Sequence, residues 1–559
     1  MIRIHVNALS DAIDVHEVTL ETVRREAGCL GNYYMDTPLI NQDNSGIHIG
    51  QERVRFKKPM KHYLKTAFIL IISLVCFQMI LSLRVFLSNT ELAKIMVLAN
   101  GNGYLAVPNA LVGDRLHSLG MALAGGLFFT LSVGALVCLV SLGATCLYPV
   151  LSLGRKTKTI VFLCVPFLVI LLVNQDGFLW LETLALVLIP VLIYFLYRFL
   201  FKGDLPVFSL KKVGFHALFP VILALVLLVF PKGTDNRIFS DFRDTFLMSN
   251  PFGMGINDFY YTYTLSPAEV FKSLDQKLIK KGAIELKSTQ NHLRQRIEHE
   301  LLAADYLILD HDENPDLTIR CEKDQLFFFH AKRLIHETRV HDFFNDPRSA
   351  FNAFSMGTDT YNGYRKLTGM ALITGLPLLV YLSLHGFFFI IGCMFMGPSL
   401  SARMASGLCL ALGLSAFVFM ASLNPKSMDP ATISADLCSD SPALRTNALH
   451  LIFDKKLDIT QYPQSKAAMA STFVPERYWY ARASANSQQK RNLTDLLDLL
   501  NDPHPNVQCQ AFFALGKLGN RRAIPEMVRR IRSSDHWYVQ WYAYKALKRL
   551  GWTQKKSNP

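Results

Sequence analysis

The chain has 559 residues, of which 51% are hydrophobic and 18% charged, and its formal net charge is +14. A soluble protein of this length normally divides into several domains with polar surfaces, whereas here the apolar residues are concentrated in long blocks, which indicates lipid-facing spans. The basic excess is expected from the positively charged cytoplasmic loops of a membrane protein, so it does not by itself indicate nucleic-acid binding.

The sequence lacks the short motifs that mark common catalytic and metal sites. Its ten cysteines stand singly and never form a Cys-x-x-Cys pair, so neither a zinc knuckle nor a thioredoxin-like redox pair is predicted. HExxH, GxSxG, a Walker loop and a dinucleotide fingerprint are also missing from the sequence. We therefore expect no catalytic residue, no metal and no cofactor.

The first 62 residues are mixed polar and contain no apolar segment of the kind that a signal peptide needs. MIRIHV and HEVTL alternate like strands, and TLETVRREAG has the composition of a short helix. A ubiquitin-like domain begins in the same order, but the pattern is short and common. We favour a small cytosolic region over residues 1–62.

About seven hydrophobic spans follow, five of them between residues 63 and 230 and two between 368 and 423. Most reach the ~20 residues that a helix needs to cross the hydrocarbon core, although the third and the fifth are short. The polar residues 174–177 separate the third span from the fourth and indicate a tight helical hairpin. The predicted spans are 64–83, 119–147, 159–173, 178–200, 214–230, 370–396 and 403–423.

Lys and Arg residues predict the orientation of these spans. They cluster before the first span, between the second and third, and between the fourth and fifth, whereas the connection 84–118 holds three and the hairpin none. This alternation predicts a cytoplasmic N-terminus in a bacterial inner membrane, with residues 231–367 outside. The C-terminal domain falls outside as well, although Arg365 and Lys366 beside the sixth span count against this last step.

Residues 231–367 are expected to form an extracytoplasmic α/β domain between the fifth and sixth spans. The capping box Ser266–Glu269, with proline at the first helical position, predicts a helix to Lys280, and a second helix is expected over 288–303. DYLILD, DLTIRCE and QLFFFHAKRLIHETRV have the alternation of three strands. The aromatic run 258–265 is interpreted as an interfacial belt or a core strand.

The C-terminal region contains an internal repeat with a period of 32 residues. Apolar residues recur at i, i+4, i+7, i+8 and i+11 and a glycine follows, which is typical of a helix with one buried face and a glycine stop. A helix pair cannot bury such a face alone, so the period predicts stacked repeats. The matching positions are Val507/Val539, Gln508/Gln540, Ala511/Ala543, Ala514/Ala546, Leu515/Leu547, Leu518/Leu550 and Gly519/Gly551, with weaker copies around Ala448 and Ala481.

This pattern resembles the short HEAT repeats related to phycobilisome-lyase modules, whose second helix reads V-R-x-x-A-x-x-A-L-x-x-L-G. The resemblance covers roughly residues 430–551 and is closest in the last two copies. The arginine that usually follows the valine is Gln508 and Gln540 here, whereas Arg445 retains it. The resemblance implies a protein-binding or scaffolding solenoid over 424–559, and in a minority of such modules an accessory role in a lyase.

An acidic turn in the inserted domain has the oxygen spacing of a calcium loop but lacks its strict features. Pro315 stands where the loop requires glycine, and Cys321 stands where it requires a bidentate glutamate. We interpret the segment as a turn between strands, and an opportunistic cation remains the alternative. Its oxygen-bearing residues are Asp310, Asp312, Asn314 and Asp316.

Ionisable residues inside spans are functional candidates by default. The sequence offers Glu182, His216 and His385. Glu182 and His216 lie within about a turn of a predicted span end, and His385 lies deeper. Because none has an obvious ionisable partner in the sequence, we do not predict a proton relay or a transport site.

Five aromatic residues at the start of the last predicted helix form the candidate binding surface: Trp537, Tyr538, Trp541, Tyr542 and Tyr544. Most of them fall off the helix face that the repeat register buries. Aromatic clusters of this kind are enriched in protein interfaces. The equally weighted alternative is that they cap the solenoid or rest on the protein's own membrane bundle.

Taken together, the sequence predicts a multi-pass α-helical membrane protein with an inserted α/β domain and a C-terminal α-solenoid of HEAT-like repeats. The favoured function is a membrane-anchored scaffold or adaptor that binds a partner protein through the repeats. The alternative is a membrane-embedded transporter or enzyme with a regulatory HEAT domain.

Residues 424–559 hold 20 Lys and Arg against 11 Asp and Glu, but we do not expect nucleic acid as a partner. The predicted domains are 1–62, 63–230, 231–367, 368–423 and 424–559.

Overall fold

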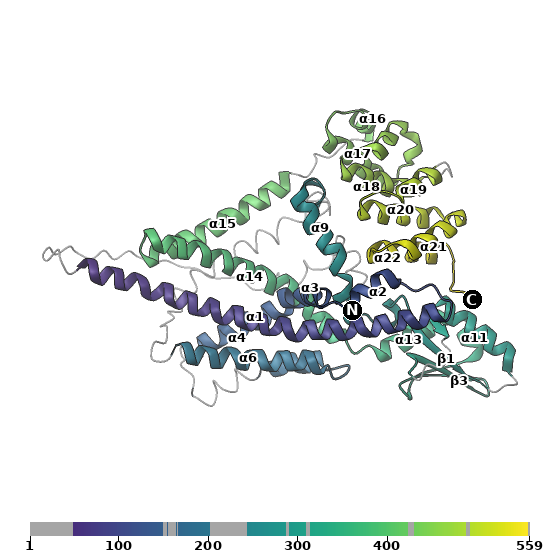
Figure 1. Cartoon of the computed structure of the whole chain (residues 1–559), viewed down its shortest axis with the longest axis horizontal. Coiled ribbons are helices and arrows are strands. Elements are labelled where there is room, and N and C mark those ends of the chain that lie inside the picture. Colours follow the sequence, from purple (N-terminus) through teal and green to yellow (C-terminus); the bar gives the residue numbers. More distant parts are fainter. Residues whose placement is uncertain are drawn as a thin grey trace, which may run out of the picture.

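The structure is a computed structural model that describes residues 48–148, 154, 164, 166–201, 243–286, 290–308, 314–422, 430–487 and 492–556 (Figure 1). Within these residues five helices are long and apolar enough to cross a membrane. The predicted span 214–230 and most of residues 159–165 lie outside the described residues, as do residues 1–47, so the number of about seven spans stays a prediction. The five candidates are Met60–Gly101, Leu119–Leu147, Trp180–Leu200, Asn362–Phe395 and Pro398–Val418.

Helix α1 (His48–Gly101) is much longer than a membrane is thick. Its 54 residues extend for about 81 Å, whereas the hydrocarbon core measures about 30 Å. The first span was predicted to end at residue 83, with a connection after it. The helix continues because neither proline nor glycine occurs between Met60 and Gly101 to stop it. The second half of α1 therefore projects beyond the apolar half and carries a buried stripe of its own, Leu92, Ile95, Met96 and Ala99.

The other spans pack around the apolar half of α1. The second span consists of α3 (Leu119–Phe129), a π-helical turn at Thr130–Gly134 and α4 (Ala135–Leu147), and α6 (Trp180–Leu200) lies beside it. Helices α14 (Asn362–Phe395) and α15 (Pro398–Ser422) form a hairpin. At Gly126 on α3 an added Cβ would lie 2.3 Å from Ser82 Oγ on α1, so the small residue is what lets the two helices approach.

The segment between α6 and α14 contains a five-stranded sheet in the order β2-β1-β3-β4-β5. Strand β1 pairs in parallel with β2 and β3, and β3, β4 and β5 form an antiparallel meander. Helices α11 (Asn291–Ala303), α12 (Val340–Asn345) and α13 (Pro347–Thr358) pack against it. The strands are β1 (Lys280–Glu285), β2 (Tyr306–Ile308), β3 (Leu317–Glu322), β4 (Gln325–His330) and β5 (Arg333–Arg339).

Several local predictions for this segment were wrong. The helix expected to run to Lys280 ends at Val270 as α10 (Leu265–Val270), because the residues from Lys280 onward pair with two strands in the middle of the sheet. The third predicted strand is a hairpin, since Ala331 and Lys332 adopt positive φ angles of 44° and 70°.

The aromatic run 258–265 is mainly helical and not a strand. It belongs to α9 (Pro251–Tyr263), whose first turn is capped by Asn250 through a 2.8 Å hydrogen bond from the Gly253 N–H to Asn250 Oδ1. Proline at the first helical position adds a second start signal. The run is therefore available to contact other parts of the chain with one helix face.

The C-terminal region is a stack of helices, of which α17, α18, α20 and α22 contact one another in sequence. The core positions predicted from the 32-residue period are buried: Ala511, Ala514, Ala543 and Leu547 are all fully shielded from solvent. Helix α20 ends at Gly519, whose φ of +73° is the left-handed conformation that glycine adopts without strain. The helices are α16 (Ile433–Leu437), α17 (Pro442–Asp454), α18 (Val474–Ala483), α19 (Leu493–Leu499), α20 (Pro505–Leu518), α21 (Ile524–Ser533) and α22 (Trp537–Arg549).

The sheet and the C-terminal helices gather at one end of α1, next to its second half and to α2 (Ala110–Leu116), as Figure 1 shows. One hydrophobic cluster joins the second half of α1, the following connection, α9 and the C-terminal repeats. These segments are thus packed on the same side of the helical bundle.

Candidate functional site

A buried ion pair links two spans at the end of the bundle that faces the sheet. Glu182, on α6, is only 2% exposed, and its Oε1 lies 3.4 Å from Nε of Arg84 on α1. Tyr361, just before α14, donates its hydroxyl to Glu182 Oε1 over 3.1 Å and accepts from Arg84 Nε over 2.7 Å. A buried carboxylate needs such partners to remain charged. The three residues therefore fasten α1, α6 and α14 to one another.

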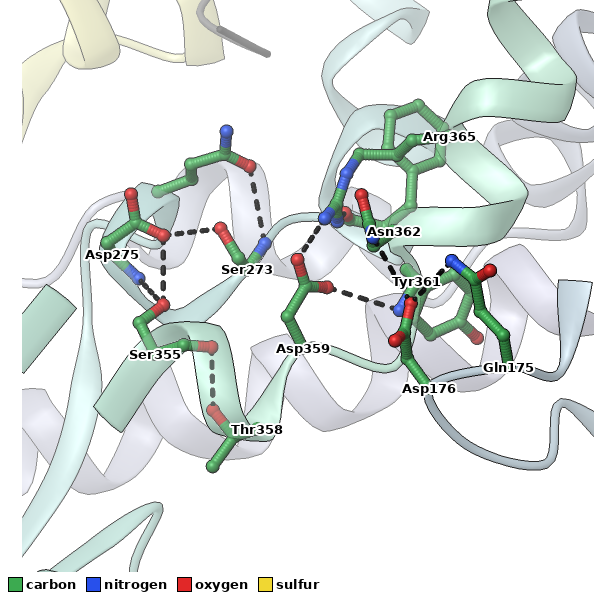
Figure 2. A network of polar contacts seen from close by, with 12 residues as sticks. Gln175, Asp176, Ser273, Asp275, Ser355, Thr358, Asp359, Tyr361, Asn362 and Arg365 are labelled. Atoms are coloured by element: carbon green, nitrogen blue, oxygen red, sulfur yellow. Dashed lines mark hydrogen bonds and ion pairs between the residues drawn. The ribbon is translucent and has the colours of Figure 1, made fainter. Parts of the chain in front are cut away.

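Figure 2 shows the polar contacts that continue from Tyr361 into the five-stranded sheet and its helices, which we call the sheet domain. Asp176, in the hairpin before α6, accepts from Asn362 Nδ2 over 3.2 Å. Asp359 pairs with Arg365, and Arg365 also donates to the carbonyl oxygen of Phe271 over 2.5 Å. Asp176 is thus bound by a residue from another segment, and Asp359 holds the arginine that reaches Phe271. We interpret the network as an anchor between the spans and the sheet domain.

The three ionisable candidates from the spans are not brought together. His385, on α14, lies 3.5 Å from the hydroxyl of Tyr63, whereas Glu182 contacts Arg84. Tyr63 and Arg84 are separated on α1 by about 31 Å, which is about the thickness of the hydrocarbon core. His216 lies outside the described residues. The sequence did not indicate Arg84 as the partner of Glu182, because the two residues are far apart in the chain.

The calcium-like turn is described only in part, since residues 309–313 lie outside the described residues. Asp316 accepts the N–H of Lys281 through Oδ2 over 2.8 Å, and its backbone carbonyl contacts His330 Nδ1 over 2.7 Å. Within the described part of the chain no group of three His, Cys, Asp or Glu residues is placed to hold a metal ion.

Asn109 fastens the connection after α1 to the last C-terminal repeat. Its side-chain nitrogen lies 2.8–3.0 Å from three carbonyl oxygens at the end of α21, the first of them that of Ile531. Its backbone N–H donates to Oε1 of Gln540 over 2.8 Å, while its own Oδ1 caps α2. The Asn109 N–H and the Gln540 side chain are buried, so the hydrogen bond between them replaces one that water would otherwise supply.

Gln540 occupies a position that recurs in every repeat. At each such position the side chain donates to the carbonyl oxygen six residues earlier, over 2.6–2.7 Å. In the first two repeats the residue is an arginine that also binds a carboxylate, Arg445 with Glu476 and Arg477 with Asp502. In the last repeat Gln540 accepts the N–H of Asn109 instead, which an arginine cannot do because it has only donors.

A second set of contacts joins the C-terminus to the same connection. Gln554 pairs with the backbone of Leu105 in both directions: its Oε1 accepts the Leu105 N–H over 3.1 Å and its Nε2 donates to the Leu105 carbonyl over 2.9 Å. Gln554 Nε2 also lies 3.2 Å from the hydroxyl of Tyr544. The chain after α22 is therefore fixed to the connection that follows α1.

The sheet domain is fastened to α22 at Asp305. Its Oδ1 accepts from the Tyr544 hydroxyl over 2.6 Å and from Lys548 Nζ over 2.9 Å. Lys280 lies close by, with its ammonium 4.5 Å from the centre of the Tyr306 ring. Burial lowers the pKa of Lys280 to about 8, and the nearby carboxylate of Asp305 opposes that effect. These charged groups therefore join the sheet domain to α22, although the two are distant in sequence.

Helix α9 covers the N-terminal ends of α20 and α22. The rings of Tyr261 and Tyr538 have centroids 4.6 Å apart, and the hydroxyl of Tyr538 lies 3.0 Å from that of Thr264. The buried amides of Asn257 and Asn506 exchange two hydrogen bonds of 3.1 and 3.3 Å. Reciprocal amide pairs of this kind fix one orientation of the two helices.

Just before α9, a buried ion pair contacts helix α18. Arg243 binds Asp244 and donates to the hydroxyl of Tyr478 over 2.8 Å, and its guanidinium lies 4.1 Å from the centre of that ring. The indole nitrogen of Trp479 donates to Asp244 over 2.5 Å. Three successive repeat helices are therefore covered at their N-terminal halves by other segments of the chain.

The five predicted binding aromatics divide between the contacts within the chain and a pocket. Trp537, Tyr538, Trp541 and Tyr544 are buried, and Tyr542 is half-buried. Tyr538 contacts α9 and Tyr544 contacts Asp305, so these two pack against other segments of the same chain. Trp541 and Tyr542 face a different feature, a pocket on the same helix.

This pocket is lined by residues of the repeat helices α18, α20 and α22 and has a volume of about 280 Å³. Three cationic side chains and three aromatic rings line it, and none of the described residues in its wall is acidic. Arg482, Phe513 and Lys545 stand at equivalent positions of successive repeats, 31 and 32 residues apart, which is the signal that could have identified them in the sequence. The lining residues are Arg482, Gln510, Phe513, Trp541, Tyr542, Lys545, Ala546 and Arg549.

The comparison with protein families supports the assignment of this part of the chain. Residues 466–557 match the family of HEAT repeats, so the C-terminal region is a HEAT-repeat domain. The match includes α18, α20 and α22 and thus the whole pocket. No curated protein and no solved structure matches the chain.

Proposed function

We propose that the protein is a membrane-anchored scaffold or adaptor that binds a partner protein through its HEAT repeats. HEAT repeats generally mediate protein interactions, and five apolar helices fit a membrane protein. The observation that carries the proposal is the division of the surface of the repeat domain into two parts. One part is covered by α9, Asn109 and Asp305, whereas another carries a pocket lined by cations and aromatic rings.

The internal contacts support a rigid presentation of this pocket. A repeat domain on a flexible tether would search a large volume, whereas one fixed to α1 and to the sheet holds its binding surface at a set distance from the membrane. Prior ordering lowers the entropy that a partner must overcome on binding. This is the property expected of a scaffold.

For the orientation, we propose a cytoplasmic N-terminus and an extracytoplasmic sheet domain and HEAT domain in a bacterial inner membrane. The Lys and Arg distribution of the sequence supports it. The contacts of the connection 102–118, the sheet domain and the HEAT domain with one another agree with a common side.

The transporter or enzyme alternative receives less support. It would need ionisable groups within the spans that can exchange protons or bind a substrate. Arg84 and Glu182 are such a pair, but Tyr361 completes their contacts and they lie about 31 Å along α1 from the level of Tyr63 and His385.

The test is isolation of the tagged full-length protein from membranes with its bound partners. We expect stoichiometric partner proteins with the wild-type chain and their loss in a Lys545→Glu/Arg549→Glu variant. Arg522→Glu, an exposed residue of the same domain outside the pocket, is the control and should retain them. Identical partners with both variants would contradict binding through this surface.

A further inference from the structure

The cations of the HEAT pocket lie close to one another and to its aromatic rings. The guanidinium carbons of Arg482 and Arg549 lie 5.7 and 5.2 Å from the centre of the Phe513 ring. Lys545 Nζ lies 3.6 Å from the centre of the Trp541 ring. A fourth cation, Lys517, extends the group beyond the pocket, since it shares the turn of α20 that follows Phe513.

The positive charges near the pocket also affect the pKa of Lys517. Burial lowers its pKa, and so do the charges of Lys456, Arg482 and Arg549 around it. Like charges raise the free energy of an empty site, and a bound anion removes that repulsion. The pocket is therefore prepared for a negatively charged ligand.

The arrangement of the rings favours carboxylates over nucleic-acid bases. Proteins that bind single-stranded nucleic acids stack each base on an open aromatic face. Trp541 is only 5% exposed, with Lys545 placed over its ring, and the Phe513 ring has guanidinium groups near it. What the pocket offers to a ligand is thus the positive charge of Arg482, Lys545 and Arg549 beside aromatic rings. Guanidinium groups match the geometry of a carboxylate with two parallel hydrogen bonds.

The volume of the pocket sets the size of what enters it. About 280 Å³ accommodates one or two side chains but not a folded domain. Part of the lining is apolar and comes from Phe513, Tyr542 and Ala546. A short segment with one apolar side chain against these residues and carboxylates beside the cations would fit both kinds of surface.

We propose that the pocket bounded by Arg482, Lys545 and Arg549 binds an acidic peptide segment of the partner protein, with glutamate or aspartate carboxylates on the cations and one apolar side chain between them. This proposal rests on the scaffold function and specifies its partner chemistry. The carboxylates of the segment lie beside the cations of α18 and α22, so its binding weakens with salt.

The experiment uses the purified full-length protein in nanodiscs of zwitterionic lipid. The probe is a fluorescent peptide, Glu-Glu-Phe-Glu-Glu with blocked ends, and its neutral match is Gln-Gln-Phe-Gln-Gln. We expect the acidic peptide to bind at least ten times more tightly than the neutral one, and at least ten times less tightly to Lys545→Glu/Arg549→Glu. Arg522→Glu, which lies outside the pocket, should bind within about threefold of the wild type. Arg549→Lys keeps the positive charge but loses the paired donors, so it should weaken binding by less than the double variant does. Equal binding of the two peptides would overturn the proposal.

Two further arms separate other sources of negative charge. A single-stranded oligonucleotide and vesicles of anionic phospholipid are tested with the same variants. Pocket-dependent binding of either one without binding of the acidic peptide overturns the proposal. Circular dichroism and gel filtration must show that the double variant is folded, and Arg549→Lys provides a conservative second variant. If cellular partners are still lost with the double variant while the acidic peptide does not bind, the scaffold function stands and the acidic ligand is wrong.

Discussion

The backbone N–H of Asn109 donates a 2.8 Å hydrogen bond to Oε1 of Gln540, across 431 residues of sequence. This bond connects the end of α1 to the last HEAT repeat. It also gives a physical reason for the departure of the repeat from its usual arginine, because arginine has no acceptor. Position 540 therefore contributes to the internal contact as well as to the repeat.

Gln540→Arg should separate these two contributions. The arginine can still donate to the carbonyl of Ser534, as Arg445 and Arg477 do in their repeats, but it leaves the buried N–H of Asn109 without its acceptor. We expect a loss of roughly 1–3 kcal/mol in the stability of this contact. Faster hydrogen–deuterium exchange over residues 104–112, with unchanged exchange in α20, measures it.

Gln508→Arg is the matched control, since Gln508 makes the same contact with the carbonyl six residues earlier, that of Asp502. This variant should leave exchange over 104–112 unchanged. A similar effect of both variants would mean that the arginine disturbs the repeat itself.

Acid should destabilise the protein through His536, which precedes α22 and whose ring centre lies 6.5 Å from that of Tyr261 on α9. Burial lowers the pKa of His536 to about 4 from 6.5, helped by Arg115 and His504 and opposed by Asp535 and Asp258. The unfolded chain takes up a proton near pH 6.5 and the folded chain only near pH 4, so stability falls as the pH decreases between these values. At about 1.4 kcal/mol per unit, the loss amounts to about 3 kcal/mol by pH 4.

Thermal unfolding in detergent at pH 7.0 and 5.5 checks this effect, because carboxylates remain mostly ionised in that window. The wild type should melt at a lower temperature at pH 5.5. His536→Gln, which cannot titrate, should show a smaller difference, with His504 contributing in the same direction through its own lowered pKa. An unchanged pH dependence in the variant would show that His536 is not the source.

The Arg84–Glu182 pair should be more costly to break than to replace. Arg84→Met leaves a buried carboxylate without its cation and should destabilise the protein by roughly 3–5 kcal/mol. Arg84→Met/Glu182→Leu removes both charges and should recover most of the loss. Thermal stability in detergent compares the two, and a double variant no more stable than the single one would argue against an ion pair that serves only to anchor the spans.

The repeats could be predicted from the sequence because their signal is local and periodic. Ala511 and Ala543 recur at one spacing, and the same helical face is buried in each copy. The contacts that cover the repeats could not be predicted in this way. Leu105 and Gln554 meet through a backbone pair that leaves no pattern in either segment, and Glu182 finds Arg84 only after two spans have packed.

The candidate site was predicted only in part for the same reason. The repeat register placed Trp541 and Tyr544 on one helix, but it could not distinguish the ring that meets Asp305 from the ring that lines the pocket. The strand at Lys280 was missed because its neighbours in the sheet, and not its own composition, determine its conformation.

The contacts between the sheet domain and the HEAT domain make a prediction about topology. Lys548 binds both the carbonyl of Ala303 and the side chain of Asp305, so these regions must share one side of the membrane. Reporter fusions after residues 300 and 559 should therefore both report the outside, whereas fusions after 50 and 205 should report the cytoplasm. Opposite results at 300 and 559 would contradict the packing.

The most direct test compares two positions four residues apart on α22. A photo-crosslinking amino acid at Tyr538 should react only with the chain's own α9, because Tyr538 packs on Tyr261 there. At Tyr542, beside the pocket, it should react in cells with a second protein and give a larger product, which Lys545→Glu/Arg549→Glu abolishes. A larger product from position 538, or none from position 542 in cells that contain the membrane-embedded protein, would contradict a HEAT domain that is covered by α9 at Tyr538 and open to a partner at the pocket.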